Sequence, residues 1–109
     1  WGTGNVRREF LYVDDCAAGI VFLLKNYSSL QHVNLGSGTD ITIRELAQCI
    51  KEIVGFKGAL KFDPTKPDGV PRKLLDTSKV NKLNWKSSVL LKSGLSKTYQ
   101  WFSENFSKA

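Results

Sequence analysis

The sequence predicts an α/β fold in which short strands alternate with helices. A strand-forming run at residues 9–13 leads directly into an apolar helical segment, and a capping pattern at residues 42–45 opens a second, amphipathic helix. An apolar stripe near the end of the chain marks a third long helix. The 109 residues suffice for one small domain with a modest core.

The first strand is expected over Glu9–Val13, which is rich in strand formers. Asp14 and Asp15 follow it as a pair suited to cap a helix and to complement its positive end. The helix expected over residues 15–26 is apolar on most sides, which predicts that it packs against more than one neighbour. In a lone chain of this length, we expect part of that face to lack cover.

His32–Leu35 is expected to form a second short strand, ended by a turn at residues 36–38. Thr42 and Glu45 fit the capping box that opens a helix, and Gly55 is placed to end that helix in a left-handed conformation. The apolar residues between them follow helical spacing on one face: Ile43, Leu46, Ala47, Ile50, Ile53 and Val54.

Residues 59–62 alternate apolar and polar side chains, as a half-buried strand does, and residues 63–71 contain three prolines and a glycine, which predicts a loop. Residues 76–78 are expected to cap a short helix that runs to Leu83. The stripe of the final helix consists of Leu91, Leu95, Tyr99, Phe102 and Phe106.

Composition favours a soluble, cytoplasmic protein. The longest strongly apolar stretch, Cys16–Leu24, is far shorter than the ~20 residues that cross a bilayer, and the first residues are not a signal sequence. Cys16 and Cys49 lack CxxC spacing and nearby ligands, so we expect buried free thiols and no metal site. Because the chain begins with Trp in what reads as the middle of a loop, we interpret it as part of a longer protein.

The formal net charge is +6, and most of the excess lies after Phe56. Dispersed cations form a solvated surface in most proteins, but they can also attract a polyanion such as a nucleotide diphosphate or a nucleic acid. A nucleic-acid-binding module would interleave aromatic side chains with a positive stripe, whereas Trp85 and Trp101 lie in apolar contexts. A non-catalytic interaction module is a further alternative that the sequence leaves open.

No catalytic set can be assembled from these residues. The turn at Gly36-Ser37-Gly38 lacks the third glycine of a dinucleotide-binding fingerprint, because Ile41 stands at that position. Its backbone N–H groups could still contact a phosphate, although a plain strand-to-helix turn explains the glycines. His32 is the one histidine and has no partner recognisable from sequence, and Tyr-x-x-x-Lys and Gly-x-Ser-x-Gly motifs are absent.

Two loops are more informative: Trp1–Phe10 and Lys66–Lys73. Each combines stiff or glycine-bent backbone with cations. An arginine fork suits phosphate, an aspartate accepts hydrogen bonds from sugar hydroxyls or ring N–H groups, and a tryptophan face covers a base or a sugar. Together they would suit a nucleotide sugar, although ordinary turns contain the same residue types.

These loops also carry a resemblance to a known family. Arg8-Glu9-Phe10-Leu11-Tyr12-Val13-Asp14-Asp15 resembles the R-E-F-x-H-V-D-D segment of the extended short-chain dehydrogenase/reductases that act on nucleotide sugars. The match extends through Trp1-Gly-Thr-Gly, Val33-Asn-Leu-Gly-Ser-Gly, Thr42-Ile-Arg-Glu-Leu and Lys66-Pro-Asp-Gly-Val-Pro-Arg-Lys-Leu-Leu-Asp76. Taken together, the segments are similar to the GDP-L-fucose synthase family, over essentially the whole chain.

The resemblance implies that residues 1–109 are the C-terminal, substrate-binding portion of an NADP(H)-dependent epimerase-reductase that converts GDP-4-keto-6-deoxy-D-mannose to GDP-L-fucose. Substrate contacts carried over from the family fall at Trp1, Arg8 and Asp68, with Lys73 near the nucleotide end. The family's catalytic and cofactor-binding residues lie upstream of this segment. We therefore expect no catalytic, cofactor-binding or metal-binding residue in this chain, and no activity from it alone.

For the full-length enzyme the resemblance implies NADP(H) as cofactor, a GDP-sugar as substrate and a homodimer, with no nucleic-acid or membrane partner. Another nucleotide-sugar epimerase or dehydratase of the same superfamily is the nearest alternative, and the loop at residues 66–73 disfavours it. The chain departs from the family at Asn5-Val6, at Tyr12 in place of a histidine, and at Leu90–Ser93, where a hydroxyl cap of the last helix is missing.

Overall fold

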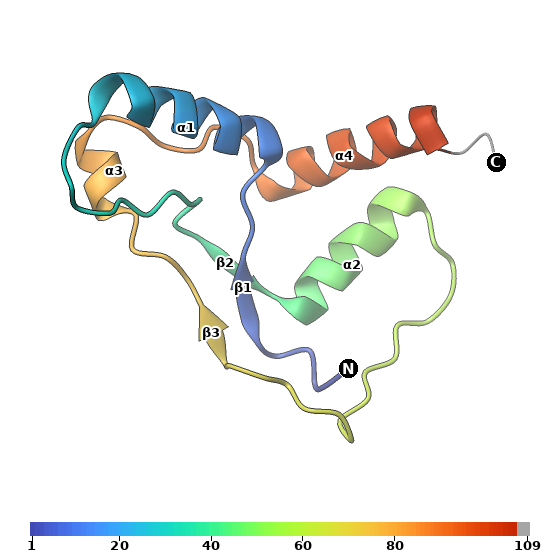
Figure 1. The fold of residues 1–109 in the computed structure, drawn as a ribbon. Helices are drawn as coiled ribbons and strands as arrows, with labels where there is room; N and C mark the ends of the chain where they lie inside the picture. Colours follow the sequence, from blue (N-terminus) through green and yellow to red (C-terminus); the bar gives the residue numbers. More distant parts are fainter. Residues whose placement is uncertain (107–109) are drawn as a thin grey trace.

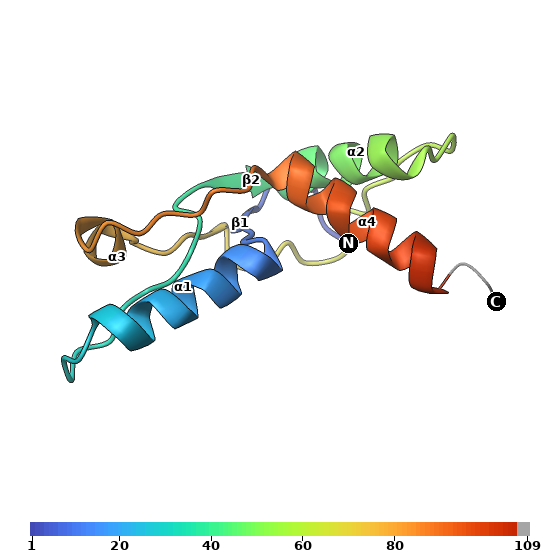
Figure 2. The same cartoon turned by 90° about the horizontal axis from the view of Figure 1, so that it is seen from above.

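The computed structural model describes residues 1–106 and shows a mixed α/β arrangement, as the sequence predicts. Strands and helices follow one another as β1 (Arg7–Glu9), α1 (Val13–Asn26), β2 (Asp40–Thr42), α2 (Ile43–Val54), β3 (Arg72–Lys73), α3 (Ser78–Lys82) and α4 (Leu91–Phe106). The sheet lies at the centre of the molecule, with α1 and α4 on one side of it in the view of Figure 1. Seen from above, the molecule is a thin slab, with extents of 49 × 36 × 20 Å (Figure 2).

The sheet has the order β2-β1-β3 and joins segments far apart in the chain. β1 pairs antiparallel with β2, with Arg8 opposite Ile41, and parallel with β3, with Arg8 opposite Lys73. Residues that face one another across strands share a face, and the face alternates along each strand. Arg8 and Lys73 therefore lie on one face, and Arg7 and Arg72 on the other.

The predicted N-terminal strand is wrong in position. β1 ends at Glu9, and the chain has already turned into α1 at Val13, two residues before the expected start. The expected cap is also wrong, because Tyr12 occupies the N-cap position without a side-chain hydrogen bond. Asp15 points into the structure instead: its Oδ2 accepts from the N–H groups of Ser88 and Val89 at 3.0 and 2.8 Å.

The strand predicted at His32–Leu35 does not form, and neither does the one at residues 59–62. No other strand runs beside residues 32–35 within the described part of the chain, so their backbone has no ladder to join. Leu35 packs on α1 instead, where a Cβ on Gly19 would come within 2.6 Å of its Cδ1. Besides β1, the strands that do form are β2 and β3, and these were missed because they are only three and two residues long.

The predictions for α2 and its ends are confirmed. Thr42 Oγ1 accepts from the Glu45 N–H at 3.1 Å, and the Glu45 carboxylate accepts from the Thr42 N–H at 2.9 Å, which completes the capping box. Gly55 ends the helix with a φ of 69°. The loop at residues 63–71 and the final helix are also confirmed. The short helix α3 ends at Lys82, one residue early. Its N-cap, Thr77, makes no side-chain hydrogen bond, but Asp76 Oδ1 accepts from the Ser78 N–H at 2.8 Å, so the predicted segment does satisfy the start of the helix.

The core is small and lies between α1 and α3. Val80 is fully buried and Trp85 is 9% exposed, and the Trp85 ring approaches Gly19 of α1. Much of α1 is open, as expected: Val13, Ile20, Val21 and Leu24 are between 48% and 79% exposed. None of the helices within residues 1–106 combines the length and hydropathy that crossing a bilayer requires.

Candidate functional site

The two loops singled out from the sequence lie side by side. Thr3 donates its N–H to Asp68 Oδ1 at 2.7 Å and its hydroxyl to Asp68 Oδ2 at 2.8 Å, across 65 positions of sequence. The Gly2 N–H donates to the Asp63 carbonyl at 2.8 Å, and the Arg7 N–H to that of Pro71 at 2.8 Å. We call residues 1–4 the tryptophan turn and residues 63–71 the proline loop.

The tryptophan turn depends on Gly2 at the point of contact. Gly2 has a φ of 77°, and a Cβ there would come within 2.2 Å of Asp68 Oδ1. Only glycine satisfies both conditions, because other residues rarely adopt this conformation and none could approach the carboxylate so closely. The turn presents Trp1, 86% exposed, with Lys66 Nζ 5.7 Å from the centre of its ring.

Arg8 and Lys73 lie next to each other on neighbouring strands of the sheet. The half-buried Arg8 guanidinium donates to its neighbour's carbonyl, that of Arg7, at 2.7 Å and reaches the proline loop, since a Cβ on Gly69 would lie 3.8 Å from Arg8 Nη2. Within residues 1–106 neither Arg8 nor Lys73 forms an ion pair. Two cations without a carboxylate partner thus stand beside the tryptophan turn and the proline loop.

On the opposite face of the sheet, Asp40 forms ion pairs with the other two arginines of the strands, Arg7 and Arg72. Its carboxylate, only 5% exposed, pairs with Arg7 Nε at 2.9 Å and with Arg72 Nε. The hydrogen bond from Arg72, and then that from Arg7, lowers the pKa of Asp40 below its ordinary value. Asp40 therefore ties three strands together through one face and leaves the cations of the other face free for a ligand.

The four residues predicted from the sequence, Trp1, Arg8, Asp68 and Lys73, are thus brought to one edge of the molecule. The structure adds a role for Asp68 that the sequence did not suggest, because both of its oxygens accept hydrogen bonds from Thr3. These bonds, the hydroxyl first and the backbone N–H second, lower the pKa of Asp68. Contact of these residues with a substrate stays a prediction.

Glu9 was missed by sequence reasoning although it stands inside the quoted motif. Its Oε1 accepts from the Gly38 N–H at 2.6 Å, and its Oε2 from the Leu75 N–H at 2.9 Å. The Glu9 carboxylate thus already accepts from the Gly38 N–H of the Gly36-Ser37-Gly38 turn, which the sequence offered as a phosphate contact. Glu9 and Gly38 are 29 positions apart, so no local sequence signal indicates this arrangement.

The remaining candidates from the sequence lie apart from this edge. His32 is exposed and lines a shallow surface hollow with Asn34, Asp76, Ser78 and Lys79. Cys16 and Cys49 are free thiols, but they are half-buried and not buried as expected. Among residues 1–106, no cluster of three or more histidine, cysteine or acidic side chains is placed to hold a metal ion.

The chain is similar in sequence to known proteins over the residues that form this edge. The family described as "NAD dependent epimerase/dehydratase family" matches residues 1–36, which include Trp1 and Arg8. Over 105 residues the chain is 59% identical to "GDP-L-fucose synthase 1" of Arabidopsis thaliana, a match that covers 96% of this chain and 32% of the relative. "GDP-L-fucose synthase" of Escherichia coli K12 is 47% identical over 114 residues, covering 96% of this chain and 36% of the relative.

Over nearly its whole length, the chain is similar to GDP-L-fucose synthases. Its structure agrees with this: a GDP-L-fucose synthetase from Naegleria fowleri, solved with NADP bound, superposes with a TM-score of 0.92 at 32% identity and matches 99% of this chain. The chain spans about a third of the length of these relatives. The similarity to GDP-L-fucose synthases covers both loops of the site, whereas the broader family match ends at residue 36, before the proline loop.

Proposed function

We propose that residues 1–109 are the substrate-binding portion of an NADP(H)-dependent GDP-L-fucose synthase, an epimerase-reductase that acts on GDP-4-keto-6-deoxy-D-mannose. The observation that carries the proposal is the meeting of the tryptophan turn with the proline loop beside Arg8 and Lys73. The homology supports the choice of a GDP-sugar over other nucleotide sugars. The whole enzyme would be a cytoplasmic homodimer.

Each residue of the site has a chemical task in this proposal. The planar fork of Arg8 binds two oxygens of the diphosphate, and the Lys73 ammonium adds a second positive charge at the nucleotide end. The exposed Trp1 ring covers the base or the sugar through its face. Asp68 holds the turn that carries Trp1, and the side of its carboxylate not used by Thr3 orients the substrate.

In the proposal, the nicotinamide cofactor binds to a part of the enzyme other than the described residues. A dinucleotide site of this class needs a glycine-rich turn between a strand and a helix with free backbone N–H groups. The Gly36-Ser37-Gly38 turn follows no strand, and Glu9 accepts from its Gly38 N–H. In the proposal, hydride transfer and epimerisation belong to other parts of the enzyme, while this chain binds and orients the sugar nucleotide.

The open face of α1 fits the same proposal. Val13, Ile20, Val21 and Leu24 expose between 48% and 79% of their surface, more apolar exposure than one helix of a small monomer usually carries. We expect this face to pack on the dinucleotide-binding part of the enzyme. A chain that binds no more hydrophobic dye than an ordinary monomer of its size would count against this packing.

The test is a chimera in which this chain replaces the matching segment of the Escherichia coli enzyme, assayed for GDP-L-fucose formation and titrated calorimetrically with GDP-fucose, GDP and UDP-glucose. We expect turnover, a preference for the GDP ligands, and weaker binding in Arg8→Ala and Asp68→Ala. Lys57→Ala, which removes an exposed cation that belongs to neither loop, is the matched control. A folded chimera that binds NADPH but no GDP-sugar overturns the proposal.

A further inference from the structure

Arg44, in the first turn of α2, also contacts the tryptophan turn. Its Nη2 donates to the Thr3 carbonyl at 2.6 Å, and its backbone N–H donates to the Gly4 carbonyl at 2.9 Å. Thr3 is therefore held by all of its backbone polar groups: Asp68 accepts from its N–H, and Arg44 donates to its carbonyl. The two anchors come from elements 24 residues apart in the sequence (68 − 44).

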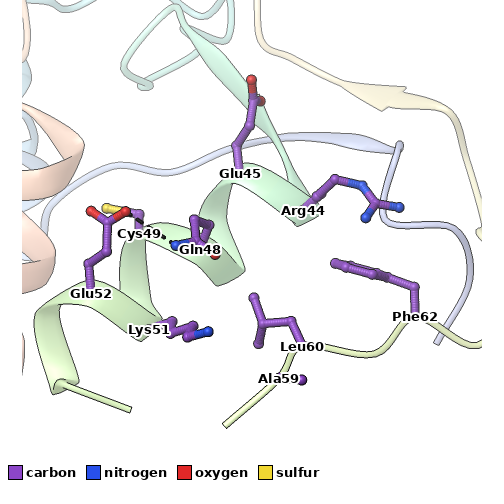
Figure 3. Close-up of a pocket in the computed structure, with 9 residues that line it drawn as sticks. All are labelled: Arg44, Glu45, Gln48, Cys49, Lys51, Glu52, Ala59, Leu60 and Phe62. Carbon is purple, nitrogen blue, oxygen red and sulfur yellow. Dashed lines mark hydrogen bonds between the residues drawn. The ribbon is translucent and has the colours of Figure 1, made fainter. Parts of the chain in front are cut away.

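The Phe62 ring stacks against the Arg44 guanidinium. The guanidinium carbon lies 3.9 Å from the centre of the Phe62 ring, and Figure 3 shows the two groups facing each other at one end of a hollow of about 720 Å³. The same ring fills the space beside Gly4, since a Cβ on Gly4 would come within 2.4 Å of Phe62 Cε1. Phe62 thus packs against Gly4 and Arg44 together.

The position of Arg44 in its helix is otherwise unfavourable. It lies two residues after the N-cap Thr42, where the helix dipole disfavours a positive charge. Glu45, its neighbour in the same turn, is engaged with Thr42 and forms no ion pair with Arg44. The contacts of Arg44 with Thr3 and Phe62 offset this unfavourable interaction with the helix dipole.

The tryptophan turn needs such anchors. Gly2 and Gly4 have φ values of 77° and 78°, a conformation open to glycine but not enforced by it, because glycine is the most flexible residue in an unfolded or loosened segment. Trp1 itself is 86% exposed, so packing of its own ring contributes little to its orientation. Where the Trp1 ring points is therefore decided by how firmly Thr3 is held.

We infer that Arg44, stacked on Phe62, is a positioning residue that orients Trp1 for the base or sugar of the bound nucleotide sugar; this inference rests on the proposed function. Arg44 itself does not touch the substrate. The arginine side chain is required because its planar group stacks on the ring and donates an in-plane hydrogen bond at the same time, which a lysine ammonium cannot do with the same geometry.

The first measurement needs no substrate. In the chimera described above, tryptophans are replaced by 5-fluorotryptophan, and the Trp1 fluorine signal is assigned with a Trp1→Phe variant. We expect Arg44→Ala and Phe62→Leu to shift and narrow the Trp1 signal, because the turn becomes mobile, while the signals of Trp85 and Trp101 stay in place. Arg44→Lys should give an intermediate signal. Lys51→Ala, which removes a cation from the same hollow without touching Thr3, should change nothing (Figure 3).

The second measurement is steady-state kinetics. We expect Arg44→Ala to raise KM for the GDP-sugar about tenfold, as loss of one charge-assisted hydrogen bond predicts. The kcat and the KM for NADPH should stay nearly unchanged. Arg44→Lys should have a KM for the GDP-sugar between those of the wild type and Arg44→Ala. Phe62→Leu keeps apolar volume in the hollow and serves if Arg44→Ala does not fold. An unchanged Trp1 signal, or a KM equal to that of Lys51→Ala, overturns the inference. If the parent chimera binds no GDP-sugar, the proposed function fails, and the fluorine spectra still decide whether Arg44 holds Trp1.

Discussion

Asp68 and Thr3, which stand at opposite ends of the sequence segment that builds the site, meet through both oxygens of the carboxylate. The Thr3 N–H and hydroxyl lie 2.7 and 2.8 Å from Oδ1 and Oδ2. Such a two-point contact fixes the direction of the turn as well as its distance from the proline loop. The pair therefore holds the two loops of the candidate site together.

The first prediction concerns the pH dependence of this pair. Its hydrogen bonds lower the pKa of Asp68 from the ordinary value of 3.8, so the pair stabilises the folded state at neutral pH. As pH falls below that value and then through the lowered pKa, the stabilisation is lost. Difference curves of Trp1 fluorescence between the wild type and Asp68→Asn, recorded from about pH 6 down to about pH 2.5, should show this transition in the wild type only. Superimposable acid titration curves would contradict the prediction.

Asp15 is predicted to be the most sensitive carboxylate for stability. It is 6% exposed and accepts from the N–H groups of Ser88 and Val89 and from the Ser88 hydroxyl. Asp15→Ala leaves these donors without their partner and should lower the free energy of unfolding by about 3 kcal/mol, measured by urea denaturation. Asp14→Ala, one residue away on the exposed side, is the control and should cost much less. Equal losses in the two variants would argue against the assigned role.

Gly36 and Glu9 should be coupled. A Cβ on Gly36 would lie 2.5 Å from Glu9 Oε1, so Gly36→Ala pushes away the carboxylate that binds Gly38 and Leu75. The expected cost is about 2 kcal/mol in urea denaturation. In a Glu9→Ala background the clash is gone, so the same substitution should cost clearly less. Additive effects in this double-mutant cycle would contradict the coupling.

The cap of α2 gives a fourth prediction. Thr42→Ala removes the acceptor of the Glu45 N–H and should lower the free energy of unfolding by about 1 kcal/mol, whereas Thr42→Ser keeps the hydroxyl and should cost far less. Because α2 also carries Arg44, the loss of this cap should loosen the tryptophan turn. Thermal denaturation of the two variants, followed by circular dichroism, makes the comparison.

The sequence by itself determined the features that depend on neighbours along the chain. The capping box at Thr42, the glycine end at Gly55, the proline loop and the final helix all follow from local backbone preferences, and all are present. The motifs of the tryptophan turn and the proline loop could also be recognised from the sequence, because a motif is defined by residue types and their order. The uncovered apolar face of α1 was also predictable from the sequence, because it follows from the composition of that segment.

Tertiary structure alone decided which distant groups meet. Asp15 was expected to cap its own helix, but two backbone N–H groups 73 and 74 residues away compete more strongly for it. The short strands could not be predicted, because a strand of two or three residues is defined by its partner and not by its own pattern. The contacts of Thr3 with Asp68 and Arg44 have the same origin: each joins polar groups whose partners are set by how the sheet brings remote segments together.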